Sequence, residues 1–164
     1  MVADDAILLV EDNPDDALMT RRALKKNHIC NEVVLVRDGA EALDYLFGSG
    51  SYEGRNLQAM PQVILLDLGL PKIDGFEVLR RIKSDEQTRR VPTVVLTSSE
   101  DQQACVESFG YGANSCVRKP LDIDQFRAMV GDLGMYWMVL NETPQAVSAY
   151  HRPSFPKDLF AATR

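Results

Sequence analysis

Val63-Ile-Leu-Leu-Asp67 is the stretch of sequence that decides the fold. Four aliphatic residues follow one another without the alternation of a half-exposed strand, which indicates a strand buried on both faces. The run is the most hydrophobic of its kind in the chain, so we expect it near the middle of a sheet. Its last residue, Asp67, places a carboxylate where the strand ends.

Similar runs recur on both sides of this stretch, separated by amphipathic segments. Further apolar runs predict strands over Ala6–Val10, Val33–Val36, Thr93–Leu96 and Ser115–Val117. Apolar residues at helical spacing predict helices from Pro14 to about Asn27 and over Ala40–Phe47, Phe76–Ile82, Ala104–Phe109 and Asp122–Leu140. This alternation predicts an α/β fold, a doubly wound five-stranded parallel sheet with five helices.

The composition is that of an acidic globular protein. The chain has 164 residues, 45% of them hydrophobic and 26% charged, which fits one domain of common size with some residues to spare. Its net charge of −6 offers no basic field to hold a polyanion, so we do not expect it to bind nucleic acid.

The sequence also indicates a location. No basic segment leads into a signal-peptide core, and nowhere do about 18 apolar residues follow one another. The three cysteines, Cys30, Cys105 and Cys116, are widely spaced and form no C-x-x-C motif, which favours reduced intracellular thiols. We therefore expect a cytoplasmic protein that does not associate with membranes.

Two segments fall outside the alternating pattern. Residues 48–61 form a long, glycine-containing connection, and residues 141–164 contain three prolines and no sustained period. We expect one domain over residues 1–140, with the extended loop 48–61, and a tail too short to be a second, output domain. Within that tail, Pro153–Phe160 is either a partner-docking segment or a mobile end.

Charged and hydroxyl residues gather where the predicted strands end. Glu11 and Asp12 follow the first strand, Asp67 ends the third, Thr97 follows the fourth, and Lys119 lies just after the fifth. These ends share one edge of a parallel sheet, where ligands of such folds bind. Converging carboxylates repel one another, and a hard divalent cation such as Mg²⁺ relieves that repulsion. Asp67 is the best candidate for a nucleophile that forms an aspartyl phosphate.

Each of these residues also has an ordinary structural interpretation. Asp12 could cap the helix that Pro14 opens, Thr97 or Ser98 could cap the fourth helix, and Lys119 could be a solvated surface lysine. Their joint occurrence at successive strand ends favours a common site.

These residues carry a family resemblance. The runs Ile7-Leu-Leu-Val-Glu-Asp-Asn13, Val63-Ile-Leu-Leu-Asp-Leu-Gly-Leu-Pro-Lys-Ile-Asp-Gly75 and Val94-Val-Leu-Thr-Ser98, followed by Lys119-Pro120, resemble receiver domains of two-component response regulators. The resemblance covers about Ala6–Leu140 and implies a flavodoxin-like (βα)₅ receiver fold. It also implies that Asp67 accepts a phosphoryl group from a histidine kinase, that the protein signals by altered protein contacts, and that it is not an enzyme in the usual sense.

The resemblance assigns a role to each site residue. Glu11, Asp12 and Asp67, with the backbone carbonyl of Gly69, would hold Mg²⁺. Thr97 and Lys119 would bind the phosphoryl oxygens, and Pro120 would follow a cis peptide bond.

One position departs from the usual receiver pattern, and other stretches resemble a subfamily of receivers. Cys116 stands where receivers usually carry Tyr or Phe, so it is either a redox-sensitive thiol or a small buried apolar residue. The long loop, the stretch Ala113–Cys116 and the ending Met135–Pro144 resemble regulators of bacterial phytochrome kinases. Such regulators tend to form homodimers through the fourth helix, fifth strand and fifth helix. Tyr136, Trp137 and Met138 would add apolar contacts there, although Trp137 could equally belong to the core.

The residues at the strand ends argue against three other functions. A Mg²⁺-dependent phosphohydrolase of the haloacid-dehalogenase type would need a second Asp where Gly69 stands. A nucleotide-binding enzyme would need a glycine-rich loop where Glu11-Asp12-Asn13 stands. A receiver-like scaffold that never accepts phosphate would not need the full set of site residues.

Overall fold

The strands in the described part of the chain form a single parallel sheet. A computed structural model describes residues 5–97 and 102–142. Its strands are β1 (Ile7–Val10), β2 (Val33–Val36), β3 (Val63–Asp67), β4 (Thr93–Thr97) and β5 (Ser115–Arg118). They pair in the order β2-β1-β3-β4-β5, all parallel, so the run that ends at Asp67 is the central strand, as its hydrophobicity predicts.

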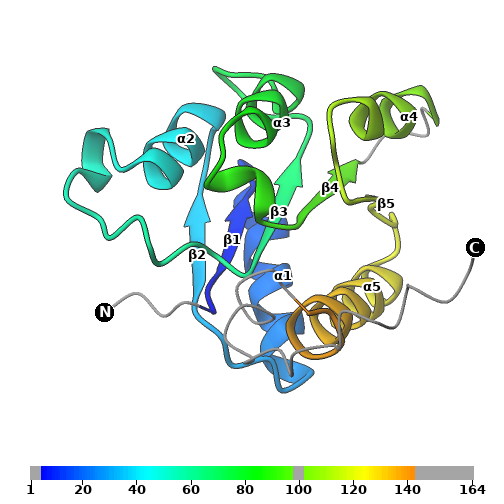
Figure 1. Cartoon of the computed structure of the whole chain (residues 1–164). Coiled ribbons are helices and arrows are strands. Elements are labelled where there is room, and N and C mark those ends of the chain that lie inside the picture. Colours follow the sequence, from blue (N-terminus) through cyan, green and yellow to red (C-terminus); the bar gives the residue numbers. More distant parts are fainter. Residues whose placement is uncertain (1–4, 98–101, 143–164) are drawn as a thin grey trace, which may run out of the picture.

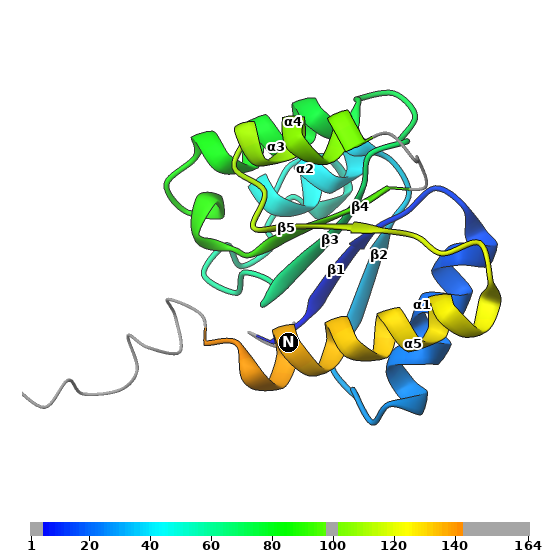
Figure 2. The same ribbon diagram turned by 90° about the vertical axis from the view of Figure 1, so that its right-hand side faces the viewer.

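Helices cover both faces of this sheet. They are α1 (Pro14–Lys26), α2 (Gly39–Phe47), α3 (Gly75–Ser84), α4 (Gln102–Gly110) and α5 (Ile123–Met135), with the short turns η1 (Gly50–Tyr52), η2 (Thr88–Arg90) and η3 (Tyr136–Leu140). Helices α1 and α5 lie on one face, and α2, α3 and α4 lie on the other (Figure 1, Figure 2). The predicted doubly wound fold is confirmed. No helix within the described residues is long and apolar enough to span a bilayer.

The central strand shows why the sheet is buried on both faces. Ile64 and Leu66 belong to the apolar cluster beneath α2 and α3, whereas Val63 and Leu65 belong to the cluster beneath α1 and α5. All four side chains are at most 3% exposed. A strand between two helical layers therefore needs consecutive aliphatic residues.

Helix α5 begins where the sequence predicts, but its α-helical part stops before the expected end at Leu140. The side chain of Asp122 accepts a hydrogen bond from the backbone N–H of Gln125, so Asp122 is the N-cap of this helix. The helix is α-helical only to Met135, and the chain continues as the π-helical turn η3. Within this turn Trp137 packs in the core at 9% exposure, whereas Tyr136 remains 49% exposed.

The glycines in α5 have a packing role. A Cβ atom on Gly134 would lie 2.8 Å from Cδ2 of Leu24, and one on Gly131 would lie 2.6 Å from the side-chain nitrogen of Asn27. Both positions therefore allow α5 to approach α1 closely, which offsets their low helix propensity.

The long connection 48–61 packs against α2. Gly48 ends that helix with φ +69°, a conformation that suits glycine. Farther along, the guanidinium of Arg55 lies 4.0 Å from the ring centre of Tyr45 and donates a hydrogen bond to the carbonyl of Ala59. Residues 143–164 lie outside the described residues, and they include Pro153–Phe160, which we expect to be either a docking segment or a mobile end.

The expectation of reduced thiols is wrong for two of the three cysteines. Cys105 on α4 and Cys116 on β5 form a disulfide with a Cα–Cα distance of 5.6 Å, and Cys30 is free. Their spacing in the sequence does not reveal this pairing, because it depends on how α4 packs beside β5. That packing brings the Cα atoms within the range of a disulfide.

Candidate functional site

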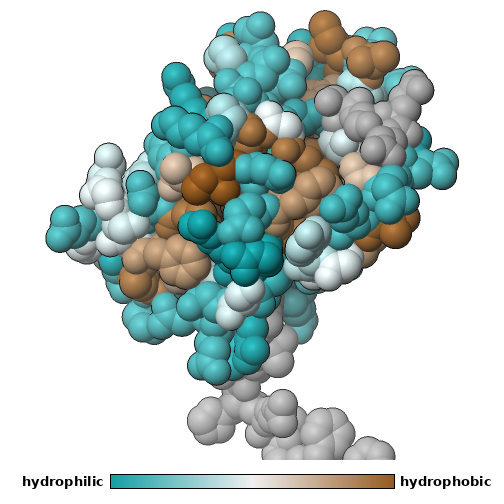
Figure 3. Space-filling model, turned by 90° about the horizontal axis from the view of Figure 1, so that it is seen from above, coloured by the Kyte–Doolittle hydropathy of each residue, from teal (hydrophilic) through white to brown (hydrophobic). Residues whose placement is uncertain are grey.

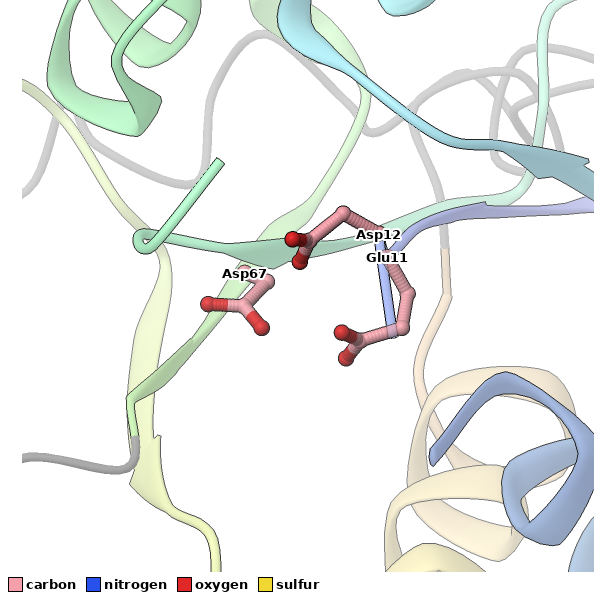
Figure 4. A group of neighbouring side chains, drawn as sticks. All are labelled: Glu11, Asp12 and Asp67. Carbon is pink, nitrogen blue, oxygen red and sulfur yellow. The ribbon is translucent and has the colours of Figure 1, made fainter. Parts of the chain in front are cut away.

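The carboxyl ends of β1 and β3 bring three acidic side chains together. Carboxylate oxygens of Glu11, Asp12 and Asp67 all lie within 4.8 Å of one another. In Figure 4, Glu11 and Asp12 come from the end of β1, and Asp67 comes from the neighbouring end of β3. Figure 3 looks down on this edge of the sheet, where hydrophilic residues adjoin apolar ones. The sequence-predicted acidic cluster is therefore present.

Lys119 lies among these acidic groups. Its Nζ donates to Oε2 of Glu11 at 2.5 Å and to Oδ2 of Asp67 at 2.8 Å. The Lys119 side chain is 7% exposed, so it is not the solvated surface lysine of the alternative interpretation. Its backbone N–H donates to the carbonyl of Thr97, which fixes the segment after β5 against the end of β4.

The charges at this site perturb one another strongly. Burial raises the pKa of Glu11 to about 7, although its hydrogen bond with Lys119 acts in the opposite direction. Burial also acts to lower the pKa of Lys119, but hydrogen bonds with Asp67 and Glu11 outweigh it and hold this pKa above its ordinary value. Lys119 is therefore a permanent cation in the site, and one lysine faces more negative charge than it can neutralise.

Asp12 does not cap the helix that follows it. The N-cap of α1 is Asn13, whose side-chain oxygen accepts from the backbone N–H groups of Asp15 and Asp16. The interpretation of Asp12 as a helix cap is therefore wrong, and its carboxylate belongs to the acidic cluster.

Asp16 is a site residue that the sequence analysis did not include. Its Oδ2 lies 3.2 Å from Nζ of Lys119, so it is a third acidic partner of this lysine. The signal in the sequence is weak, because acidic residues are common in the first turn of any helix. Only the packing of α1 beside the segment after β5 shows that Asp16 faces the site.

The backbone next to Asp67 is shaped by glycines. The N–H of Gly69 donates to Oδ1 of Asp67 at 2.8 Å and thereby orients the carboxylate. A Cβ atom on Gly75 would lie 2.6 Å from Cα of Leu68 and 2.9 Å from the carbonyl oxygen of Asp67. Helix α3 can therefore begin directly beside the segment that carries Asp67 only because this position has no side chain.

Thr97 lies at the same edge as the acidic cluster. It is the last residue of β4, is 4% exposed, and follows Leu96, which pairs with Asp67. Helix α4 is described from Gln102 onward, so the alternative that Thr97 caps this helix stays a prediction. The other predicted cap, Ser98, lies outside the described residues.

The predicted cis bond before Pro120 is wrong. The structure has no cis peptide bond among the described residues, so the Lys119–Pro120 bond is trans. Trans is the more stable isomer of an X–Pro bond by about 0.5 to 1 kcal/mol. Lys119 reaches both Glu11 and Asp67 with the bond in this form.

The donor set fits a hard divalent cation. Three carboxylates offer oxygen ligands, the atoms that Mg²⁺, Mn²⁺ and Ca²⁺ prefer, and neither sulfur nor imidazole is among them. A cation here would also relieve the excess of negative charge around Lys119.

Known proteins are similar to this chain over most of its described length. The family model described as response regulator receiver domain matches residues 7–131. Response regulator Rcp1 of Synechocystis is 36% identical over 140 residues, covering 85% of this chain and 93% of Rcp1. The Mn²⁺-bound crystal structure of Rcp1 has a TM-score of 0.79 at 35% identity and covers 85% of this chain and 99% of that one.

Two further solved structures are similar over nearly the same range. The phosphorylated cyanobacterial phytochrome response regulator RcpA has a TM-score of 0.79 at 38% identity, covering 85% of this chain and 98% of that chain. The bacteriophytochrome response regulator AtBRR is 50% identical with a TM-score of 0.67, covering 84% and 98%.

Proposed function

This chain belongs to the family of response regulator receiver domains, and we propose that it accepts a phosphoryl group from a histidine kinase on the carboxylate of Asp67. The observation that carries the proposal is the position of Lys119, whose Nζ lies 2.8 Å from Asp67 within a cluster of carboxylates. A cation that touches the nucleophile can neutralise the charge of an incoming phosphoryl group.

The chemistry uses residues of this chain in distinct roles. An oxygen of Asp67 attacks phosphorus, the P–N bond of the donor phosphohistidine breaks, and the histidine nitrogen leaves with the electron pair. Lys119 neutralises the phosphoryl oxygens, and Thr97 donates a hydrogen bond to them from the end of β4. When bound by Glu11, Asp12, Asp67 and the carbonyl of Gly69, Mg²⁺ would supply the remaining neutralising charge.

We propose that the signal is a shift between two arrangements near α4. Phosphorylation brings close to two negative charges to Asp67 and draws in Thr97, which precedes α4, and Lys119, which follows β5. The family acts in signalling, so the expected output is a changed protein contact and not a released product.

The relatives favour a phytochrome-type kinase as the phosphoryl donor. Two similar solved structures are described as a cyanobacterial phytochrome response regulator and a bacteriophytochrome response regulator. We expect the transfer to take place in the cytoplasm, where kinases are phosphorylated from ATP. The phosphohydrolase alternative is disfavoured because Gly69 offers no second acidic side chain next to Asp67.

We further propose a homodimer through α4, β5 and α5. A groove of about 610 Å³ runs between β5 and α5, lined in part by Val117, Met129, Leu133 and Tyr136. Neighbouring side chains on these elements are also exposed, including Val106 at 64% and Phe109 at 53%. A second copy of this face would cover apolar area that the monomer leaves in water.

The test of the phosphoacceptor uses a small phosphoryl donor. Acetyl phosphate with Mg²⁺ should raise the intact mass of the protein by about 80 Da, the mass of one phosphoryl group less a proton. The gain should vanish in Asp67→Asn and with EDTA. It should persist in Asp15→Asn, which removes an exposed carboxylate outside the cluster. An undiminished gain in Asp67→Asn would show that another residue is the nucleophile.

A further inference from the structure

The disulfide between Cys105 and Cys116 ties together two elements that flank the site. Helix α4, which carries Cys105, follows the strand that ends at Thr97. Strand β5, which carries Cys116, leads directly to Lys119. The bond closes a loop with a sequence separation of 11 residues.

Helix α4 buries little of its surface. Ser108 is its one buried residue, and Val106 and Phe109 point substantially into solvent. By contrast, α3 buries Gly75, Val78, Leu79 and Ile82. The covalent bond to β5 therefore adds to the contacts that hold α4 against the sheet.

We propose that Cys105 and Cys116 are a reversible redox pair, which a peroxide closes and a dithiol opens, and which fixes α4 to β5 when closed. Thiols in a reducing compartment stay reduced unless they are paired for transient oxidation, and a disulfide there is usually a sensor or a catalyst. The two sulfur atoms are already adjacent in the fold, and both residues are only partly buried, so a small oxidant can reach them.

The oxidation balances in two steps. One cysteine thiolate attacks a peroxide oxygen, the O–O bond breaks, and a sulfenic acid and hydroxide form. The second thiolate attacks the sulfenic sulfur, the S–S bond forms, and hydroxide leaves; the two hydroxides take up the two thiol protons. The two sulfur atoms lose two electrons and hydrogen peroxide becomes two waters. A dithiol reverses the bond by thiol–disulfide exchange and is itself oxidised to a disulfide.

Cys30 provides an internal control for the pairing. It is exposed and free, and it is the one cysteine of the chain's three that lies outside the disulfide. Full-length protein reduced with dithiothreitol and freed of it should show three alkylated cysteines by intact mass after denaturation. After brief treatment with dilute hydrogen peroxide it should show one, with peptide mapping joining Cys105 to Cys116.

Two variants distinguish a specific bond between Cys105 and Cys116 from unspecific oxidation of thiols. Cys30→Ser should keep the peroxide-dependent bond, and Cys105→Ser should lose it. The proposal is overturned if peroxide leaves all three thiols open to alkylation, if the bond joins Cys30, or if dithiothreitol fails to open it in the folded protein.

The effect on α4 needs its own measurement. Hydrogen exchange of the α4 backbone amides should be about tenfold slower or more in the oxidised protein than in the reduced one. Exchange in α2, which carries no cysteine, should not change. Equal exchange of α4 in both states would overturn its fixation by the bond. None of these readouts requires phosphorylation, so they succeed or fail independently of the proposed phosphoacceptor.

Discussion

Lys119 holds together carboxylates that would otherwise repel one another. Its Nζ contacts Glu11, Asp16 and Asp67, and its side chain is 7% exposed. Removing one partner from such a buried group leaves charges without compensation, which costs more than the loss of an exposed ion pair. The stability of this site should therefore depend on whether some other cation is present.

Lys119→Met should destabilise the protein by about 3 kcal/mol in EDTA, because Glu11 and Asp67 lose their shared cation. Added Mg²⁺ should reduce this deficit, because a divalent cation replaces part of the missing charge. Urea unfolding with and without Mg²⁺ measures both effects.

The matched control is Lys72→Met. Lys72 pairs with Asp38 at 2.7 Å, but its side chain is 67% exposed, so the change should cost much less stability than Lys119→Met and should not respond to Mg²⁺. Equal losses in the two variants would contradict a special role for Lys119.

Single residues differ in how far the sequence reveals them. Glu11, Asp67 and Lys119 could be predicted because each lies next to a recognisable strand end. The sequence does not show whether Asp12 or Asn13 caps α1, because adjacent residues with similar side chains compete for the same backbone N–H groups. Asp16 could not be predicted because its contact with Lys119 joins residues far apart in the sequence.

The position of Asp67 depends on the close approach of α3 to the segment after β3. Helix α3 begins at Gly75 directly beside the backbone of Asp67 and Leu68, where a Cβ atom would lie within 2.9 Å of main-chain atoms. Main-chain atoms cannot move aside as a flexible side chain can, so any side chain here must displace α3 or the segment that carries Asp67.

Gly75→Ala should destabilise the protein by about 1 to 3 kcal/mol and slow phosphorylation by acetyl phosphate, because the displaced segment carries the nucleophile. Urea unfolding and the time course of the mass gain measure the two effects. Gly110→Ala is the control, because nothing lies within 4 Å of a Cβ atom there, and it should change stability by no more than about 0.5 kcal/mol. Normal stability and rate in Gly75→Ala would refute this role.

The sequence predicts the bounds of the strands more accurately than the end of the last helix. Aliphatic runs located all five strands to within about two residues. The end of α5 was missed, because the apolar spacing continues through Leu140 while the backbone shifts to a π-helical turn at Tyr136. The pairing of Cys105 with Cys116 depends on the position of α4 beside β5, which no local pattern encodes.

Several large apolar side chains are exposed at the end of α5. Tyr136, Val139 and Leu140 follow α5 and are 49%, 61% and 65% exposed, and Tyr136 lines the groove between β5 and α5. A net charge of −6 opposes self-association over long distances, so the apolar contact must supply the stabilisation of a dimer.

Tyr136→Glu should weaken the proposed dimer at least tenfold, because it places a carboxylate in the apolar contact. Sedimentation velocity over a range of concentrations, before and after phosphorylation, measures the change. Leu18→Glu on α1 is the control; Leu18 is 46% exposed but lies outside the proposed face, so the dimer should be unaffected. A wild-type protein that stays monomeric in both states would contradict the dimer.

The order of strands and helices specified the architecture of the molecule well. A parallel sheet with helices on both faces follows from alternating buried runs and amphipathic segments, and the strand order places the acidic residues at one edge. Contacts between distant segments, such as that of Gln62 with the carbonyl of Trp137, were not predictable, because they depend on the packing of the finished layers.

The most direct test of the account is to locate the phosphoryl group. Borohydride reduces an aspartyl phosphate to homoserine, and tandem mass spectrometry then identifies the converted position. After treatment with acetyl phosphate and Mg²⁺, we predict conversion of Asp67 and of no other aspartate. Conversion of Asp12 or Asp16 in its place, or a mass gain with no converted aspartate, would contradict the assignment of Asp67 as the phosphoacceptor.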